Sequence, residues 1–422
     1  MERLYSILEI MKIKDIVRFH SETTTPIPDV VYHLYSLPSF DNNQTREELL
    51  GQDIQSNKFT VPNRCILFNK LNVRFKRIWR IDSDEDHKIA STEFLPLIID
   101  ENKVDFDYCF YLLASPAITD YLCGQNANTS GSHKRIDPTN FFNIGIKLPP
   151  LAQQYEIGKL LSSLDTKIKL NRQINQNLEA MTKQLYDYWF VQFDFPDENG
   201  KPYKSSGGKM VWDKRLKREI PLLWKAKIVE EVADVYNGAT PSTVNELNYG
   251  GDIVWITPKD LSDQKQKFVY QGERNISQVG YDSCSTHLLP SNTILMSSRA
   301  PIGLLAIAKT ELCTNQGFKS FVSKSKNIAT YLYYYLQYHI TQIEQLGTGT
   351  TFKEVSREDI LKFPMLKPSD NVLDLWEEIV SALNDRQLEI QKENENLIKQ
   401  RDELLPLLMN GQVSVNSDLS AH

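Results

Sequence analysis

Two short segments of the chain have residue types typical of catalytic or cofactor-binding loops. The run Asp137–Phe141 (DPTNF) has part of the Asn/Asp-Pro-Pro-aromatic loop pattern of amino-methyltransferases. It lacks the second proline, and no glycine-rich cofactor loop follows a strand upstream of it. The run Gly347–Thr351 (GTGTT) has the small, polar residues of a phosphate-binding loop, but it follows a helical pattern and no Gly-Lys-Ser/Thr completes it. The sequence therefore favours neither a methyl-transfer site nor a nucleotide-binding loop.

Histidine and cysteine do not predict a metal site. The seven histidines never occur in an HxxxH spacing, and the five cysteines are scattered, with no CxxC pair among them. An odd number of scattered cysteines also argues against a disulfide framework and favours a reducing compartment. The N-terminal segment has apolar pieces interrupted by charge, so we expect neither a signal peptide nor a membrane span. These features predict a cytoplasmic protein that does not bind a membrane.

Basic residues gather in two segments, although the chain as a whole is acidic, with a formal net charge of -6. Between Lys58 and Arg80 there are seven Lys or Arg residues and no Asp or Glu, with four aromatic residues among them. The segment from Arg299 to Lys326 has five basic residues against one acidic residue, Glu311. Lys and Arg neutralise phosphates, and Arg can bind guanine edges in a bidentate manner. Both segments therefore favour contact with double-stranded DNA, and a solvated basic surface without a partner is the alternative.

The chain contains an internal repeat, which explains why such segments occur twice. Val17 recurs as Val232 and Thr25-Pro26 as Thr240-Pro241, at one common offset and without a gap between them. At slightly larger offsets, VPNRCILF at 61–68 matches LPSNTILM at 289–296, and HKRI at 133–136 matches FKEV at 352–355. The preserved order of these matches makes chance a poor explanation. The loops before HKRI and FKEV are both small and polar, which suits a surface that meets a polar partner, although a plain loop is the alternative.

A long helix is expected to follow each of the two mixed α/β globules. The predicted ranges are 1–150 for the first globule, 151–196 for the central helix, 197–220 for a connector, 221–368 for the second globule, 369–413 for the C-terminal helix and 414–422 for a tail. Pro149 and Pro150 precede the first helix, as helix N-termini permit. The Gly/Ser/Lys-rich segment 197–209 is typical of an exposed connector.

Both predicted helices carry an apolar stripe at 3-4 spacing, the pattern of helices that pair along their length. The residues expected to pair or to bind partners are Leu161, Leu164, Ile168, Asn175, Leu178 and Leu185 on the first helix, and Leu383, Ile390, Asn394, Leu397 and Leu404 on the second. Asn175 and Asn394 occupy equivalent positions, so they either face each other and fix the register or are partly exposed polar residues near the seam. The two helices could pair with each other, antiparallel, or with helices of other chains.

Several motifs resemble the specificity (S) subunit of type I restriction-modification systems, and the resemblance runs from about Met11 to Val413. KLPPLAQQYEIGKLLSSLDTKIKLNRQINQNLEAMTKQLYDYWF is similar to the central region of that family. EVADVYNGATPST followed by YGGDIVWITPKDLSD is similar to the start of a target-recognition domain, and LLPLLMNGQV to the C-terminal helix ending. The first globule departs from this pattern, because Thr23 stands where the second has Gly238.

The resemblance implies a mixed α+β architecture of two target-recognition domains joined by two long antiparallel coiled-coil helices, with an internal pseudo-two-fold repeat. Each domain would read one half of a bipartite DNA sequence. The helices would bind each other and two modification subunits, and the restriction subunits would be further partners. Catalysis, with its S-adenosylmethionine, ATP and Mg, would belong to those partners, so this chain would be a non-catalytic subunit without a cofactor.

The residues that we expect near DNA come from both globules. They are Lys70, Arg74, Lys76, Arg77, His133, Lys134 and Arg135 in the first, and Thr240, Pro241, Ser242, Lys259, Arg299, Lys319, Thr350, Thr351 and Lys353 in the second. Two rival hypotheses are a coiled-coil scaffold that never touches DNA and a solitary DNA-modifying enzyme. The scaffold predicts that charge reversals at Arg74, Arg77 and Arg299 leave function intact. The enzyme predicts methyl transfer by the isolated chain.

Overall fold

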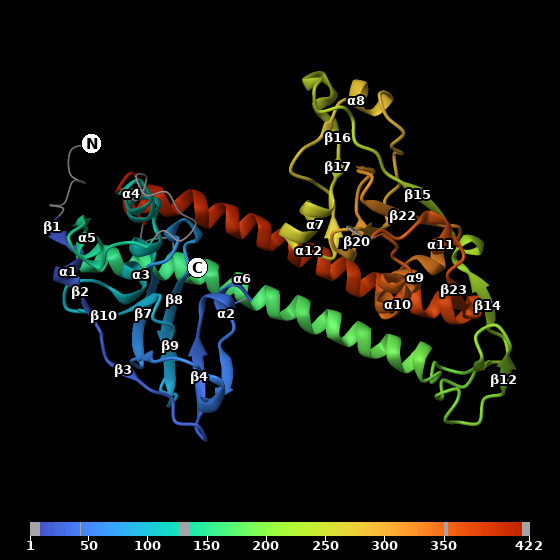
Figure 1. Cartoon of the computed structure of the whole chain (residues 1–422), viewed down its shortest axis with the longest axis horizontal. Coiled ribbons are helices and arrows are strands. Elements are labelled where there is room, and N and C mark those ends of the chain that lie inside the picture. The colour runs from blue at the N-terminus through green and yellow to red at the C-terminus, as the bar shows by residue number, and fades with distance from the viewer. Residues whose placement is uncertain (1–8, 43, 126–134, 350–352, 416–422) are drawn as a thin grey trace. The chain divides into compact units, whose positions relative to one another are not determined.

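The structure is a computed structural model with mixed helices and strands, and it describes residues 9–42, 44–125, 135–349 and 353–415 (Figure 1). The chain divides into two compact units. The first comprises Met1–Arg172 and Glu393–His422, and the second comprises Gln173–Lys392. Each unit therefore contains one globular part and one segment from each of the two long helices, α6 (Leu151–Tyr186) and α12 (Asp370–Met409).

The first unit contains two main sheets. The four-stranded sheet has the order β2-β10-β7-β8 and is antiparallel throughout, whereas the five-stranded sheet β3-β6-β9-β4-β5 contains the parallel pair β4 and β9. A separate antiparallel pair joins β1 (Glu9–Lys12) to β11 (Gly145–Leu148). The strand bounds are β2 Val17–Phe19, β10 Phe94–Ile99, β7 Arg64–Asn69, β8 Ile78–Asp82, β3 Thr23–Thr24, β6 Lys58–Thr60, β9 Lys88–Ala90, β4 Val31–Tyr35 and β5 Glu47–Leu50.

Helices pack around the four-stranded sheet and connect it to α6. They are α1 (Ile13–Ile16), α2 (Leu37–Asp41), α3 (Phe106–Ala114), α4 (Pro116–Gln125) and α5 (Pro138–Phe142). The core contains Phe68 from β7 and Tyr108 from α3, both almost fully buried. Gly158 is the only glycine of α6, and a Cβ at this position would lie 2.8 Å from the backbone nitrogen of Tyr108. The glycine thus allows α6 to approach the N-terminus of α3 closely.

The second unit is built on the five-stranded sheet β15-β22-β19-β20-β18, whose β18–β20 pair is parallel. The smaller pairs are β17–β21, β14–β23 and β12–β13. The strand bounds are β15 Ala233–Asn237, β22 Phe318–Ser323, β19 Ile294–Ser298, β20 Ile302–Ala308, β18 Phe268–Val269, β17 Trp255–Ile256, β21 Cys313–Thr314, β14 Lys225–Ile228, β23 Pro364–Lys367, β12 Met210–Asp213, β13 Arg218–Pro221 and β16 Tyr249–Ile253. The matching runs RCILF and NTILM of the two repeats contribute to β7 and β19, respectively.

Aromatic residues fill the core between the globular part of the second unit and the long helices. Its short helices are α7 (Pro258–Gln264), α8 (Gln278–Asp282), α9 (Ala329–Tyr338), α10 (Ile340–Gln345) and α11 (Arg357–Leu361). Trp376 of α12 is fully buried, with ring centroids 4.9 Å from Phe190 and 5.8 Å from Tyr334 of α9. This cluster holds α9 and the end of α6 against α12.

The segment after α6 is folded as well as exposed. The helix continues into a π-helical turn at Asp187–Val191, and the chain then forms the β12–β13 hairpin. Asp194 accepts hydrogen bonds from the backbone nitrogen and hydroxyl of Ser205, at 2.8 and 2.6 Å. The ring of Tyr203 stacks on Phe195 at 4.6 Å. The segment 197–220 that the sequence suggests as a connector is therefore held in place by specific contacts.

The two long helices pair antiparallel within each unit, which confirms the intramolecular pairing. In the first unit Arg401 of α12 binds Asp165 of α6 at 2.8 Å, and Asn171 donates to Glu393 at 2.8 Å. In the second unit Asn175 donates to the backbone oxygen of Gln387 at 3.3 Å. Earlier residues of α6 thus meet later residues of α12.

The seam between the helices is more polar than the apolar stripe predicts. Leu161, Ile168 and Ile390 are buried, while Leu164, Leu178, Leu185, Leu383, Leu397 and Leu404 are only half-buried. Buried amide side chains accompany them, namely Asn171, Asn384, Gln387, Gln391 and Asn394. The hypothesis that Asn175 faces Asn394 is wrong, because Asn175 exchanges hydrogen bonds with Gln387 (Asn175 Nδ2 to the Gln387 oxygen, and Gln387 Nε2 to the Asn175 oxygen). When two equivalent helices pair antiparallel, equivalent residues come opposite each other only at the centre of the paired length, where the two-fold axis of the repeat would pass.

Both long helices have charged residues throughout. Among the described residues, no helix combines the length and the apolarity that crossing a bilayer requires.

Candidate nucleic-acid interface

Three loops of the second globular part converge on the turn Asn315–Gly317. After β15, the nitrogen of Ala239 donates to the oxygen of Thr314 at 3.0 Å, and the hydroxyl of Thr240 binds the side chain of Gln316. At the end of β19, the nitrogen of Ser298 donates to the oxygen of Gly317 at 2.7 Å. A Cβ at Gly317 would lie 2.8 Å from the ring of Pro258 at the start of α7. The turn therefore lies next to the segments that contain Thr240, Lys259 and Arg299.

Glu354 connects a fourth segment to this group. It accepts hydrogen bonds from Lys319 at 3.2 Å and Ser298 at 3.3 Å, and it forms an ion pair with Arg299 at 3.7 Å. Its backbone bonds to Thr348 in both directions, at 3.1 and 3.0 Å. The structure therefore brings Arg299, Lys319 and the chain beside Lys353 together, with a carboxylate among the cations.

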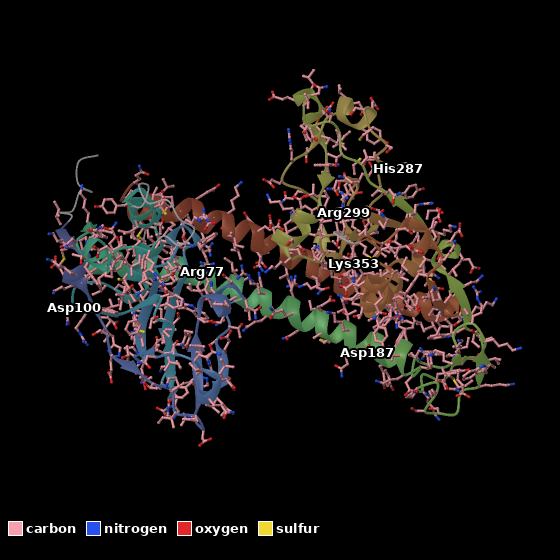
Figure 2. All side chains as sticks on the ribbon, viewed as in Figure 1. Arg77, Asp100, Asp187, His287, Arg299 and Lys353 are labelled. Carbon is pink, nitrogen blue, oxygen red and sulfur yellow. The ribbon has the colours of Figure 1, made fainter. Side chains whose placement is uncertain are left out.

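The candidate residues of the second globular part differ in exposure. Figure 2 labels Arg299 and Lys353 in this part of the chain. Lys353, Thr240 and Ser242 are exposed, whereas the Lys319 side chain is only 6% exposed and Pro241 is buried. Lys319 thus lies beneath the surface, where Glu354 balances its charge. The backbone oxygen of Pro241 accepts from the Tyr249 hydroxyl at 2.8 Å, which fixes the loop. Thr350 and Thr351 lie outside the described residues.

Lys259 is exposed and forms an ion pair with Glu273 at 2.7 Å. The hydrogen bond to Glu273 raises the pKa of Lys259. Because both side chains are more than half exposed, this ion pair contributes little to stability and can exchange for a phosphate.

In the first globular part, the β7–β8 loop presents an aromatic side chain between two guanidinium groups. Phe75 is 51% exposed, and the guanidinium carbons of Arg74 and Arg77 lie 4.6 and 4.8 Å from its ring centroid. Asn72 and Lys76 flank the turn with positive φ angles of 52° and 40°. A loop held in this shape displays apolar and cationic groups together, as contact with nucleic acid requires.

Carboxylates distant in the sequence bind several of these cations. Arg77 makes a bidentate pair with Asp41, at 2.8 and 2.7 Å, and Arg135 makes a bidentate pair with Glu93. Within the described residues, Arg74 and Lys76 form no ion pair. These two exposed cations are therefore the ones most available to phosphate. His133 and Lys134 lie outside the described residues.

A β-bridge occurs at equivalent positions of the two repeats. In the first globular part Leu71 bridges Arg135, and the nitrogen of Ile136 donates to the oxygen of Lys70 at 2.9 Å. In the second, Arg299 bridges Glu354. The alignment of the two repeats in the sequence pairs Leu71 with Arg299 and Arg135 with Glu354, so the two bridges correspond. The residue on the second strand of each bridge forms an ion pair. In the first bridge it is the cation Arg135, paired with Glu93, and in the second it is the anion Glu354, paired with Lys319, so the charge at this position is reversed between the repeats.

Sequence reasoning missed Gln316 and Glu354. Gln316 is exposed on the turn where the loops converge, and glutamine can bind adenine through two hydrogen bonds. The run TNQG between two β-type segments was the available signal for a turn. Glu354 gave no signal of its own, because its role depends on Lys319 and Arg299, which lie on or next to other strands.

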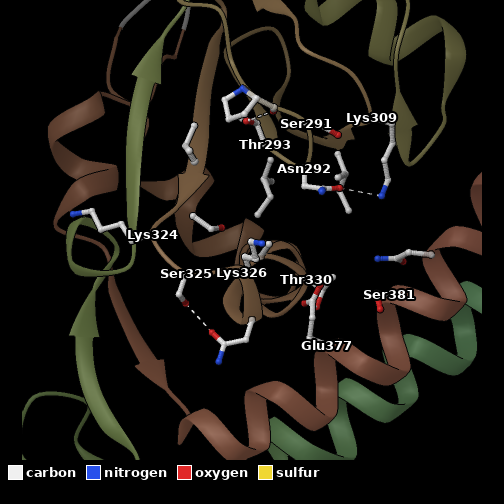
Figure 3. A pocket seen from close by; sticks show the side chains of 18 of the residues that line it. Ser291, Asn292, Thr293, Lys309, Lys324, Ser325, Lys326, Thr330, Glu377 and Ser381 are labelled. Carbon is white, nitrogen blue, oxygen red and sulfur yellow. Dashed lines mark hydrogen bonds between the residues drawn. The ribbon is translucent and has the colours of Figure 1, made fainter.

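A separate cleft of about 900 Å³ lies between the five-stranded sheet of the second unit and α12 (Figure 3). Its lining residues include none of the candidate DNA-contacting residues described above. Its polar groups bind one another. The Thr330 hydroxyl donates to Glu377 at 2.6 Å, and Lys309 donates to Asn292 at 3.1 Å. Burial lowers the pKa of Lys309 and raises the pKa of Glu377.

The described residues contain no group of three or more His, Cys, Asp or Glu that could hold a metal ion. Burial raises the pKa of the Cys65 thiol to about 12 and that of Cys313 to about 11. These thiols are therefore protonated at neutral pH and are poor nucleophiles.

Residues 7–180 and 221–400 both match the family described as type I restriction modification DNA specificity domain. The chain belongs to this family. Because one domain description fits both halves, the match also confirms the internal repeat. The resemblance stated from the motifs is confirmed.

Known relatives agree with this assignment. The chain is 25% identical over 397 residues to the type I restriction enzyme HindI specificity subunit of Haemophilus influenzae, covering 82% of this chain and 86% of that protein. It is 35% identical over 197 residues to the MjaIX specificity subunit of Methanocaldococcus jannaschii, a match that spans less than half of either protein, 45% and 46%. The crystal structure of a type I restriction-modification S subunit from M. genitalium has the same fold, with a TM-score of 0.60 at 13% identity over 96% of this chain and 97% of that one.

Proposed function

We propose that each globular part is a target-recognition domain that reads one half of a bipartite DNA sequence. The observation that carries this proposal is the double match to the specificity-domain family, which gives one chain two domains of the same kind. The two equivalent β-bridges, Leu71 with Arg135 and Arg299 with Glu354, support the proposal. The loop of each bridge also has an exposed cation, Lys76 in the first globular part and Lys353 in the second. Cations at these positions neutralise phosphates, while side chains such as Gln316 can contact base edges.

The chain recruits the enzymes that act on its DNA target and has no catalysis of its own. Two modification subunits bind along α6 and α12, the restriction subunits join the complex, and S-adenosylmethionine, ATP and Mg are bound by those partner subunits. Exposed apolar residues on the two helices support this assignment, among them Leu170, Met181 and Ile379. The complex works in the cytoplasm, on double-stranded DNA.

A methylation map of the host genome with and without this gene tests the proposal. Loss of one split motif on deletion, two short half-sites around a fixed unspecified gap, is the expected result. Survival of every methylated motif would contradict it and would favour a scaffold. Absence of any split motif in the parent strain would contradict it too.

Charge reversal separates recognition from scaffolding more directly. Arg74 and Lys76 suit this test better than Arg77 or Arg299, because they form no ion pair in the described part of the chain and reversal leaves no carboxylate unpartnered. Arg74→Glu with Lys76→Glu should abolish methylation of the split motif without lowering the melting temperature. Unchanged methylation would favour the scaffold hypothesis.

A further inference from the structure

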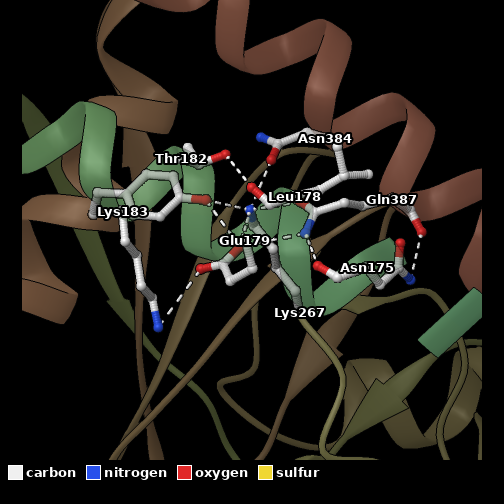
Figure 4. A network of polar contacts seen from close by, with 9 residues as sticks. Asn175, Leu178, Glu179, Thr182, Lys183, Lys267, Asn384 and Gln387 are labelled. Atoms are coloured by element: carbon white, nitrogen blue, oxygen red, sulfur yellow. Dashed lines mark hydrogen bonds and ion pairs between the residues drawn. The ribbon is translucent and has the colours of Figure 1, made fainter. Parts of the chain in front are cut away.

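A single lysine connects the sheet of the second recognition domain to both long helices. Lys267 directly precedes β18, the edge strand of the five-stranded sheet, and its side chain is only 12% exposed. Its ammonium lies within hydrogen-bond distance of four acceptors (Figure 4). They are Glu179 Oε2 at 2.8 Å on α6, Asn384 Oδ1 at 2.8 Å and Gln387 Oε1 at 3.0 Å on α12, and the Tyr334 hydroxyl at 2.5 Å on α9.

The acceptors are linked to one another, so the cluster acts as a unit. The Tyr334 hydroxyl donates to Glu179 at 3.0 Å, and Gln387 Nε2 donates to the same carboxylate at 3.4 Å. Gln391 of α12 also donates to the backbone oxygen of Phe268 at 3.0 Å, one residue after Lys267. The edge strand is therefore bound to α12 through its backbone as well as through the lysine.

Burial of this charge is costly, which argues for a role besides stability. Burial lowers the pKa of Lys267 to about 8, despite the opposing charge of Glu179. Burial also tends to raise the pKa of Glu179, but Lys267 and the Tyr334 hydrogen bond lower it overall. Replacing a buried ion pair by apolar residues is often neutral or stabilising, whereas separating its partners is strongly destabilising.

An ion pair of this kind fixes the position of β18 along α6 and α12 more strictly than apolar contacts do. Apolar side chains recur every three or four residues along a helix, so a strand edge can slide by one turn and still find apolar partners. A slip of one turn, about 5.4 Å, would move Lys267 away from the carboxylate and both amides. The ammonium would then remain unpaired near Tyr333, Tyr334 and Phe268, and the Glu179 carboxylate would keep only Lys183 as a cationic partner, at 3.9 Å.

We propose that Lys267 is a positioning residue, which fixes the register of the second recognition domain on α6 and α12 and thereby the length of the DNA gap between the half-sites. The inference rests on the proposed function, because it presumes that both domains bind one bipartite target. Successive base pairs are about 3.4 Å apart, so a one-turn slip corresponds to about one or two base pairs. Gap length is therefore the property that loss of Lys267 should change.

The test compares genome methylation in host strains that carry the full-length variants. Lys267→Met alone would leave the Glu179 carboxylate without its closer cation, with only Lys183 at 3.9 Å, so the variant that decides is Lys267→Met with Glu179→Gln, which removes both charges of the closer pair. Gln387→Met is a second variant, which removes one acceptor and no charge. Lys183→Met is the matched control, because Lys183 lies 3.9 Å from the same carboxylate but is half exposed and comes from α6 itself.

In the double variant, sites whose gap differs by one or two base pairs should rise from background to at least a tenth of the methylation at the native gap. Gln387→Met should show a smaller rise, and Lys183→Met none. Methylation confined to the native gap in the double variant would overturn the inference, and so would complete loss of methylation while the protein accumulates normally. If the double variant fails to accumulate, the Gln387→Met strain decides: methylation confined to sites with the native gap in that strain would overturn the inference. A parent strain without any split motif would instead refute the proposed function.

Discussion

Replacing Gly238 by alanine should disrupt the loops that converge on Asn315–Gly317. The added Cβ would lie 2.2 Å from the backbone oxygens of Thr314 and Asn315, where ordinary contacts begin at 3.4 Å. The two segments must therefore move apart until the Cβ reaches an ordinary contact distance from both oxygens. Both colliding oxygens belong to the backbone, one at the end of β21 and one in the residue that follows it, so a side-chain rotation cannot relieve the contact.

The separation threatens specific hydrogen bonds as well as packing. Ala239 donates to Thr314 at 3.0 Å and accepts from the indole of Trp255 at 3.1 Å. Overpacking costs about 1–3 kcal/mol, and each weakened hydrogen bond about 0.5–1.5 kcal/mol. We expect a loss of about 2–4 kcal/mol in the free energy of unfolding of the second unit.

Urea denaturation followed by tryptophan fluorescence measures this loss, because Trp255 lies at the affected contact. Gly124→Ala is the control, since a Cβ on that helical glycine meets nothing within 4 Å. Alanine is the better helix former by about 1 kcal/mol, so the control should be unchanged or slightly more stable. In the genome, Gly238→Ala should reduce methylation of the split motif at least tenfold. Wild-type stability and methylation in Gly238→Ala would refute the reasoning.

Three further predictions concern the helices and their contacts. Arg401→Met and Asp165→Asn should each destabilise the chain by about 1–3 kcal/mol. The double variant should lose less than the sum of the two, because the side chains share one ion pair. Additive losses in a double-mutant cycle would contradict this. Trp376→Ala should cost about 3–5 kcal/mol, while Trp212→Ala, at a side chain 64% exposed, should cost under about 0.5 kcal/mol; equal melting temperatures would contradict the packing described. Burial lowers the pKa of His339 below its usual 6.5, so the unfolded chain takes up the proton first as pH falls. The stability that this group contributes is complete above about pH 6.5 and decreases as pH falls through the lowered pKa. Between about pH 7.5 and 5.5 the melting temperature should therefore drop more in the wild type than in His339→Gln. An equal drop in both proteins would show that His339 does not contribute.

The repeat and the long helices could be predicted because their signals lie in the residue order itself and do not depend on how the chain folds. An apolar stripe at 3-4 spacing and a glycine-poor run specify a long paired helix, whatever the rest of the chain does. The composition of the seam could not be predicted. Asn384 and Gln387 look like exposed polar residues in the sequence, and they are buried because Lys267, from a distant part of the chain, supplies their partner.

The basic segments illustrate the same limit. The run from Lys58 to Arg80 contains no acidic residue, yet Arg77 binds Asp41 and Arg80 binds Asp107. Local charge therefore overstates the free positive charge, because folding brings carboxylates from other strands and helices. The convergence of loops on Asn315–Gly317 is likewise a property of the sheet order, which places segments far apart in the sequence side by side.

Exchange of one recognition domain shows whether each half of the chain reads its own half-site. Residues 1–150 would be replaced by the corresponding segment of a relative with a different target, and the methylated motifs of the host genome would be mapped. We expect one half-site to change, while the other half-site stays the same. A change in both half-sites, or in neither, would contradict the claim that each half of this chain reads its own half of the DNA target.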